Sequence, residues 1–229
     1  MYAVVFGGGA CCSEPRCNAY LACTAPRTSQ TCRESSDHGP WNSWDRVPYI
    51  STLKTGKASI TPVTRIVHHN FIIGNYNAQE AMDTDDGSAY LHTHHNVMVY
   101  GDNGLKSDFG GHDNVWESNL LAYVGSCYGS MFESFSWGWP GYNDAFRNNT
   151  CVFRTMYAST CGDKPSALID PSFDVGANRV YSEDGALKVC GGKVDFADWQ
   201  AQGHDTKSTL GKWPADKDLI AQARAMLGF

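Results

Sequence analysis

The sequence predicts an all-β fold, a parallel β-helix (solenoid), on three observations. An asparagine that leads a mostly apolar segment recurs at intervals of 26, 23, 30 and 29 residues, as expected when strands stack in register while surface turns absorb insertions. The second residue after each asparagine is apolar, so both positions share the inward face of a strand. An asparagine buried in every coil can bond to its copies above and below, which offsets the cost of burying its amide. The asparagines are Asn70, Asn96, Asn119, Asn149 and Asn178.

The chain divides into three segments. Residues 1–31 are rich in Cys, Pro, Ser and Thr without a clear period, and we expect them to be irregular. Residues 32–213 hold the repeats and form the expected β-helix. Residues 214–229 carry apolar side chains at helical spacing and predict a short C-terminal helix that caps or flanks the last coil. Because the start of the chain has no evident cap and no signal-peptide pattern, we expect a solenoid truncated at its N-terminus.

Composition excludes several classes of function. The chain has 229 residues, of which 42% are hydrophobic, enough for one core. The formal net charge is −6, and no run of Lys or Arg provides the basic surface that nucleic-acid binding requires. No stretch approaches 18 consecutive apolar residues, so the sequence contains no membrane span. We therefore expect a soluble monomer with neither nucleic acid nor membrane as a partner.

Nine cysteines indicate an oxidising compartment. Five of them fall within the first 32 residues, which favours disulfides and secretion. Their spacing lacks the paired C-x-x-C pattern of a zinc site. An odd count leaves one thiol without an intrachain partner, and Cys151, at an inward position of its coil, is the candidate for a plain buried residue.

A second set of stacked segments predicts a column of charge. Counting back from the asparagines aligns residues 81–85 with 104–108, and a further 23 residues leads to 127–130. In a strand alternation, Met82 and Leu105 point to one face while the charged residues between them point to the other. We expect Asp83, Asp85, Lys106 and Asp108 on an outer face.

The acidic members of this column are candidate catalytic groups. Three carboxylates within four residues repel one another and raise at least one pKa unless a cation or base is near. Neighbouring coils bring carboxylates to about 5 Å, a spacing that suits glycoside hydrolysis. We expect Lys106 to lie beside Asp83 and to lower its pKa. The candidates are Asp83, Asp85, Asp86, Lys106 and Asp108.

Two other interpretations of the acidic cluster stay open. In a turn, Asp86 beside Gly87 would bond to local backbone amides and have no catalytic role. Alternatively, the carboxylates hold calcium, which prefers oxygen ligands. An EF-hand is excluded because Gly87 comes one position early and His94 stands where the bidentate glutamate belongs.

Histidine pairs precede two of the repeated asparagines. The coil register stacks His68 on His94 and His69 on His95. Such a cluster is compatible with a zinc site, but an ordinary surface stack explains it as well. The metal assignment stays open.

Two segments contain residues suited to sugar binding. The stretch 33–46 is dense in acid, base, amide and aromatic side chains, and the insertion 131–144 is rich in aromatic residues that either stack on sugar rings or cover one side of the coil. Together with His112, these segments supply the substrate-binding candidates, which are Asp37, His38, Trp41, Trp44, Arg46, His112, Trp137 and Trp139.

The chain resembles secreted right-handed parallel β-helix proteins of the pectin-lyase-like superfamily over residues 32–210. The segments that carry the resemblance are DHGPWNSWDR at 37–46, DDGSAY at 85–90, GLKSDFGGHDN at 104–114 and WQAQGHD at 199–205. The resemblance implies a carbohydrate groove along an outer strand face and an extracellular location. The sequence lacks the GHG and RIK motifs of polygalacturonases, and fold alone does not fix the reaction.

These observations predict an extracellular enzyme that acts on a polysaccharide, with glycoside hydrolysis as the first hypothesis. One alternative is a lyase or epimerase acting on uronates, in which Lys106 or a histidine removes the proton α to the carboxylate and calcium or Arg46 neutralises that carboxylate. The other is a carbohydrate-binding or cell-surface coil without catalysis.

Overall fold

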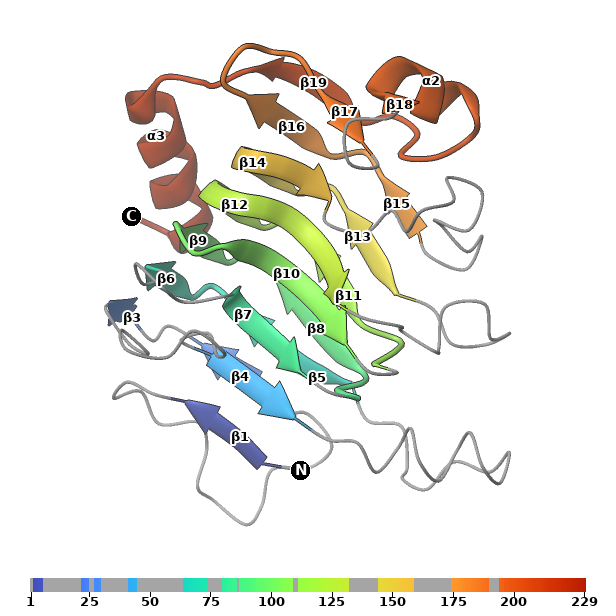
Figure 1. The fold of residues 1–229 in the computed structure, drawn as a ribbon. Coiled ribbons are helices and arrows are strands. Elements are labelled where there is room, and N and C mark those ends of the chain that lie inside the picture. Colours follow the sequence, from blue (N-terminus) through green and yellow to red (C-terminus); the bar gives the residue numbers. More distant parts are fainter. Residues whose placement is uncertain are drawn as a thin grey trace, which may run out of the picture.

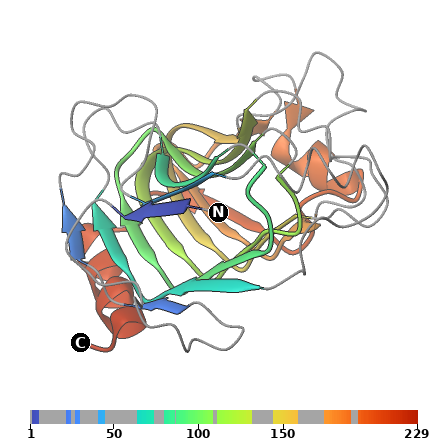
Figure 2. The same ribbon diagram turned by 90° about the horizontal axis from the view of Figure 1, so that it is seen from below.

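The computed structural model shows a parallel β-solenoid whose strands form stacked layers (Figure 1). The structure describes residues 2–5, 22–24, 27–29, 41–44, 64–73, 80–85, 87–108, 111–131, 144–158, 174–189 and 194–229. Seen after a 90° turn, successive coils overlie one another (Figure 2). The predicted fold class is confirmed.

One parallel sheet forms a wall of the solenoid. Its order is β15-β13-β11-β8-β5-β2. Neighbouring strands come from consecutive coils, as in the pairing of Val67 in β5 with Thr93 in β8, and of Thr93 with Trp116 in β11. The bounds are β2 Ala22–Thr24, β5 Arg65–His68, β8 Leu91–His94, β11 Val115–Glu117, β13 Ala145–Arg147 and β15 Asp174–Gly176.

A second, larger sheet supplies two further walls that meet at a long bent strand, β12, Leu120–Met131. The first half of β12 pairs with β9 and the second half with β10. The bend follows Tyr123, which has φ 57°, and coincides with a register shift against β14. The other strands are β1 Tyr2–Val5, β3 Arg27–Ser29, β4 Trp41–Trp44, β6 Phe71–Ile73, β7 Glu80–Asp85, β9 Val97–Val99, β10 Asn103–Asp108, β14 Thr150–Ala158, β16 Arg179–Ser182 and β19 Thr209–Lys212.

Short strands also fall within residues 1–31, which we expected to be irregular. β2 and β3 extend the two sheets in parallel, whereas β1 pairs with β4 in the antiparallel sense. Near the other end, an antiparallel pair, β17 Lys188–Val189 and β18 Val194–Asp195, leads into a helix that the sequence did not predict, α2 Phe196–Ala201.

The asparagine ladder is confirmed. Each Asn side chain is at most 1% exposed, and the Nδ2 of each of the first four donates to the Oδ1 of the asparagine one coil further on. From Asn70 onward the four Nδ2–Oδ1 distances are 2.8, 3.1, 3.0 and 3.4 Å. The last rung, Asn178, donates its backbone N–H to the hydroxyl of Ser208, which ends the ladder.

A left-handed residue precedes every rung of the ladder. His69, His95, Ser118, Asn148 and Ala177 all have φ between 53° and 56°. A non-glycine residue in this region costs roughly 1–2 kcal/mol, so the repeat marks a turn that the surrounding bonds hold in place. The ladder therefore fixes both the register of the coils and the corner between two sheets.

The core fills the interior between the walls. Met82, Met98, Leu121 and Val180 are fully buried, and they include the predicted inward positions of the repeats.

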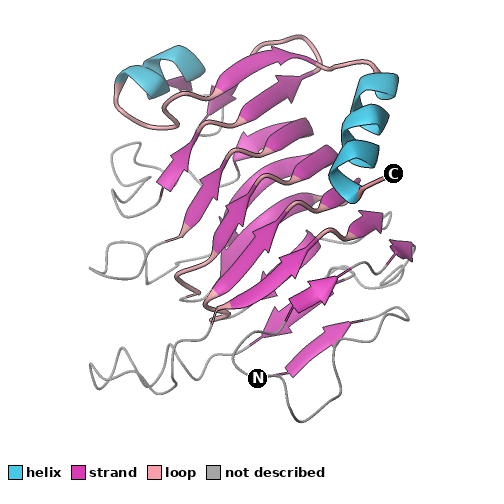
Figure 3. Cartoon of the chain, turned by 180° about the vertical axis from the view of Figure 1, so that it is seen from behind, coloured by secondary structure: helices cyan, strands magenta, loops and turns pink. Residues whose placement is uncertain are grey.

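Among the described helices, none is long and apolar enough to cross a membrane. The C-terminal helix α3, Asp216–Leu227, is confirmed and lies along the outside of the stack, as the view from behind also shows (Figure 3).

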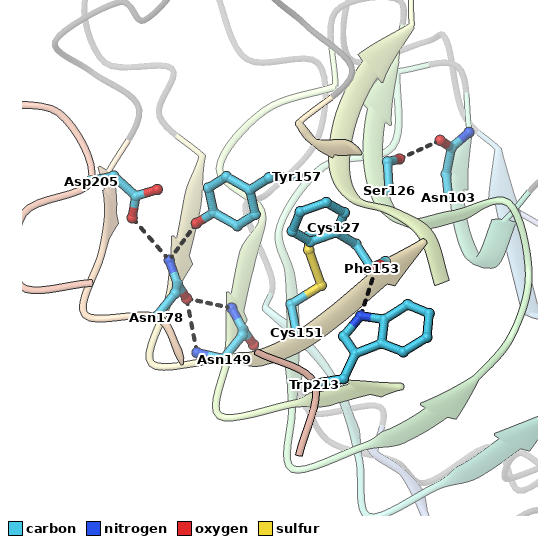
Figure 4. Close-up of a disulfide and its surroundings, with 10 residues drawn as sticks. All are labelled: Asn103, Ser126, Cys127, Asn149, Cys151, Phe153, Tyr157, Asn178, Asp205 and Trp213. Atoms are coloured by element: carbon cyan, nitrogen blue, oxygen red, sulfur yellow. Dashed lines mark hydrogen bonds between the residues drawn. A yellow bond between two sulfur atoms is a disulfide. The ribbon is translucent and has the colours of Figure 1, made fainter. Parts of the chain in front are cut away.

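A disulfide crosses the interior between two walls (Figure 4). Cys127, in the second half of β12, is bonded to Cys151 in β14, and their Cα atoms are 5.9 Å apart. Both residues are fully buried. The expectation that Cys151 is a plain buried thiol is therefore wrong: its inward position was assigned correctly, but the bend of β12 brings a second cysteine to it.

Candidate functional site

The charged column has the predicted strand register. Leu105 in β10 pairs with Met82 in β7, and Met82 pairs with Trp41 in β4. Because side chains alternate along a strand, the residues that follow these three share the opposite face. Asn42, Asp83 and Lys106 consequently stand in one line across three coils.

These side chains form a compact buried cluster, which we call the Asp83–Lys106–Asp85 triad. Lys106 Nζ lies 3.1 Å from Asp83 Oδ1 and 3.5 Å from Asp85 Oδ1. Asn42 Nδ2 donates to the other oxygen of Asp83 at 2.7 Å. One ammonium group thus bridges two carboxylates, and an amide holds the deeper one in place.

Burial differs sharply within the triad. The side chains of Asp83 and Lys106 are 0% and 3% exposed, whereas Asp85 is 16% exposed. The column was expected on a solvent-exposed outer face, and for Asp83 and Lys106 this expectation is wrong. Asp85 is the member of the triad with access to solvent.

The surroundings of Asp83 shift its pKa strongly. Burial is the largest influence on Asp83 and raises its pKa to about 6, against the opposing attraction of Lys106. Asp85 repels the charged form of Asp83 and adds to the rise. The sequence-based expectation that Lys106 lowers the pKa has the right sign for that contact, but it is wrong for the net result because desolvation dominates.

The arrangement also bears on calcium. The carboxylate oxygens of Asp83 and Asp85 contact an ammonium nitrogen, which supplies the positive charge that a bound cation would provide. Within the part of the chain that the structure describes, no group of three or more His, Cys, Asp or Glu side chains is arranged to hold a metal ion.

Two predicted substrate-binding residues belong to the interior instead. The Trp41 side chain is 6% exposed and packs in the main core, so it does not offer a ring to a sugar. His112 is 3% exposed, its Nδ1 lies 2.7 Å from Asp113 Oδ2, and its ring packs edge-on against Tyr90. Both side chains are thus part of the packed interior of the described fold.

The remaining sequence-based candidates stay predictions. Asp108 ends β10 and Trp44 ends β4, but only their backbone is described. The other candidates lie outside the described residues: Asp37, His38, Arg46, Asp86, Trp137 and Trp139.

The histidine stack forms as predicted on the outer face of the β5/β8 wall. The rings of His68 and His94 are parallel with centroids 4.9 Å apart, and those of His69 and His95 are 5.4 Å apart. Burial, followed by the neighbouring His92, lowers the pKa of His94 to about 4.

The sequence analysis missed the charged continuation of this stack. Glu117 Oε1 lies 2.8 Å from His92 Nε2, and Glu117 Oε2 accepts from Arg147 Nε at 3.0 Å. Arg147 also reaches Asp174 at 2.8 Å. In the strand register, His94 pairs with Glu117, and Glu117 pairs with Arg147 in the following coil. Extending the histidine alignment by two coils would therefore have indicated this ion pair.

Comparison of the chain with family models, curated proteins and solved structures finds no match. The fold assignment therefore rests on the strand register, the ladder and the core described above.

Proposed function

We propose that the protein is an enzyme that acts on an extracellular polysaccharide by glycoside hydrolysis, with Asp85 as the reacting carboxylate. The observation that carries this proposal is a partly open carboxylate held 3.5 Å from a buried ammonium whose other partner, Asp83, is fully buried. Pairs of acidic groups in unequal environments are typical of sites that divide acid and base roles.

Lys106 defines the role of Asp85. Its ammonium lies 3.5 Å from Asp85 Oδ1 and so fixes the position of the carboxylate that we propose as the nucleophile. Asp83 is the positioning residue: it holds the ammonium from below and is itself held by Asn42. In this arrangement Asp83 acts through Lys106 and does not touch the substrate.

Asp108 is the proposed general acid. Continuing the offset that pairs Leu105 with Met82 would place the backbone of Asp108 opposite that of Asp85, at the ends of β10 and β7. In the proposed reaction Asp85 attacks the anomeric carbon while Asp108 gives its proton to the leaving oxygen. Water, deprotonated by Asp108, then displaces Asp85 from the sugar, so the configuration is retained.

The triad argues against elimination by Lys106. A lyase base must reach the α-proton of its substrate, whereas the Lys106 nitrogen contacts the carboxylates of Asp83 and Asp85. Lys106 is also only 3% exposed, so a polymer cannot reach its nitrogen.

A polysaccharide screen with two readouts tests the reaction class. Hydrolysis produces new reducing ends without ultraviolet absorbance, and this is the expected result. Elimination would produce an unsaturated product that absorbs in the ultraviolet and would overturn the assignment of Asp85. Binding of polysaccharide with neither product would identify a carbohydrate-binding coil and contradict catalysis.

A further inference from the structure

A cavity of about 490 Å³ lies between the C-terminal helix α3 and the strands β9 and β12. Val97, Val99 and Leu120 line it from the sheet, and Leu219, Ala223 and Leu227 line it from the helix. The volume falls within the range of about 300–1,000 Å³ that is typical of sites for small ligands. The triad contributes nothing to this lining, so the cavity is separate from the proposed active site.

Exposed apolar side chains gather at this cavity. Tyr100, Ile220 and Phe229 all line it and are 50%, 58% and 65% exposed. In the described part of the chain, the one other large apolar side chain with comparable exposure is Met156, outside the cavity. A concentration of exposed apolar surface around a concave site indicates that a ligand covers it.

The aromatic side of the cavity is held rigidly. The rings of Tyr100 and Tyr123 are stacked with centroids 6.3 Å apart, and the Tyr123 hydroxyl donates to Asp216 Oδ1 at 2.6 Å. This bond engages one oxygen of the Asp216 carboxylate, which keeps its negative charge, and it raises the pKa of Tyr123 to about 12. Asp216 is thereby committed to positioning Tyr123.

The described lining holds one charged side chain of each sign, Arg224 and Asp216, and the Asp216 carboxylate already accepts the Tyr123 hydroxyl. Arg224 lines the cavity from α3 and is exposed, and no carboxylate of the described residues lies within ion-pair distance of its guanidinium. Asp216 and Arg224 are eight residues apart, so they lie about 12 Å from each other along the helix. Arg224 is thus well placed to pair with an anionic head while an apolar tail runs toward Tyr123.

We propose that this cavity binds a small amphipathic anion, with its single carboxylate at Arg224 and its linear or flat apolar body between α3 and the Tyr100/Tyr123 pair. A free sugar would find few hydrogen-bonding groups among these side chains and would leave its hydroxyls unsatisfied. A cationic amphiphile would meet Arg224 with like charge. The inference is independent of the polysaccharide proposal.

Titration calorimetry of the full chain with decanoate, 1-decanol and decyltrimethylammonium tests the proposal. We expect saturable one-to-one binding of decanoate and no comparable binding of the cation. Arg224→Gln should weaken decanoate binding roughly three- to fivefold, as expected for one exposed ion pair, and leave decanol binding unchanged. Lys217→Gln is the matched control, because it removes an equal charge from an exposed position of α3 outside the lining. Tyr100→Ala should weaken decanoate and decanol alike.

Several results would overturn the proposal. Equal losses in Arg224→Gln and Lys217→Gln would show a general charge effect without a site. Equal affinity for the anion and the cation would remove the role of Arg224. No saturable binding, or a dimer in sedimentation whose contacts require Tyr100 and Ile220, would show that the apolar surface serves another occupant. Each variant is compared with the parent chain by melting temperature before binding is measured.

Discussion

Lys106 Nζ lies 3.1 Å from Asp83 Oδ1, and both side chains are almost completely removed from solvent. Asp83 depends most on this contact, because without Lys106 its carboxylate would be buried without an opposite charge, whereas Lys106 also contacts Asp85. This relationship links the register of the solenoid to the chemistry proposed for Asp85, since Lys106 and Asp83 belong to successive coils.

Lys106→Met should destabilise the fold by about 3–5 kcal/mol, the cost of breaking a buried ion pair from one side. Asp83→Asn should reduce this penalty when combined with Lys106→Met, because the double variant no longer buries an uncompensated carboxylate at residue 83. Denaturant unfolding of the four proteins measures the coupling free energy between the two sites. Strict additivity of the two single changes would contradict the contact.

Titration of Asp83 should make the free energy of unfolding decrease as pH rises. Its folded pKa of about 6 lies above the unfolded value near 3.8, so the folded state binds more protons between these limits. The contribution of Asp83 to the free energy of unfolding is fully present below about pH 3.8 and is lost as the pH rises through 6. Asp83→Asn should remove this slope in urea unfolding measured from pH 4 to 7. An unchanged slope would show that Asp83 titrates normally.

Titration of His94 should make the free energy of unfolding increase as pH rises. Burial and the neighbouring histidines lower its folded pKa to about 4, whereas the unfolded value is 6.5. The folded state therefore binds fewer protons between pH 4 and 6.5, and stability falls as pH drops through that window. In His94→Gln the acid-side loss of stability should be smaller than in the parent. NMR titration of the His94 ring with a midpoint near 6.5 would disprove the explanation.

Replacement of any asparagine of the ladder should lower the free energy of unfolding. Asn119 donates to Asn149 Oδ1 and to Thr93 O, and its Oδ1 accepts from Asn96. Asn119→Ala should cost about 2–3 kcal/mol, because buried partners lose their hydrogen bonds. Glu183→Ala, at an exposed position, is the control and should change stability by less than about 0.5 kcal/mol. Comparable losses in the two variants would argue against a buried ladder.

The repeats could be predicted because each coil carries its own signal. The asparagine and the apolar residue two places on recur at Asn96 and Met98 as they do at Asn119 and Leu121, so one alignment fixes register and inward face together. The same alignment paired Lys106 with Asp83, although it could not show how deeply both are buried.

Features that depend on contacts distant in sequence were missed. Trp41 lies in a stretch without alternation, and its place in the core follows from pairing with Met82, which is remote along the chain. The Cys127–Cys151 bond requires the bend of β12, which no local pattern predicts. A second polar chain, in which Asn114 accepts from the backbone of Leu91 and donates its own N–H to Asp144, has too few rungs to stand out as a repeat.

The most direct test of the catalytic proposal is release of reducing ends from the polysaccharide that the screen identifies, measured for the parent chain, Asp85→Asn, Asp108→Asn and the control Asp174→Asn. Asp174 is 62% exposed on another wall of the solenoid and pairs with Arg147. We expect Asp85→Asn and Asp108→Asn each to lower kcat by roughly a hundredfold or more, as for loss of a positioned catalytic group, with melting temperatures close to that of the parent. Asp174→Asn should keep full activity. Full activity in Asp85→Asn, with its fold intact, would contradict the proposal.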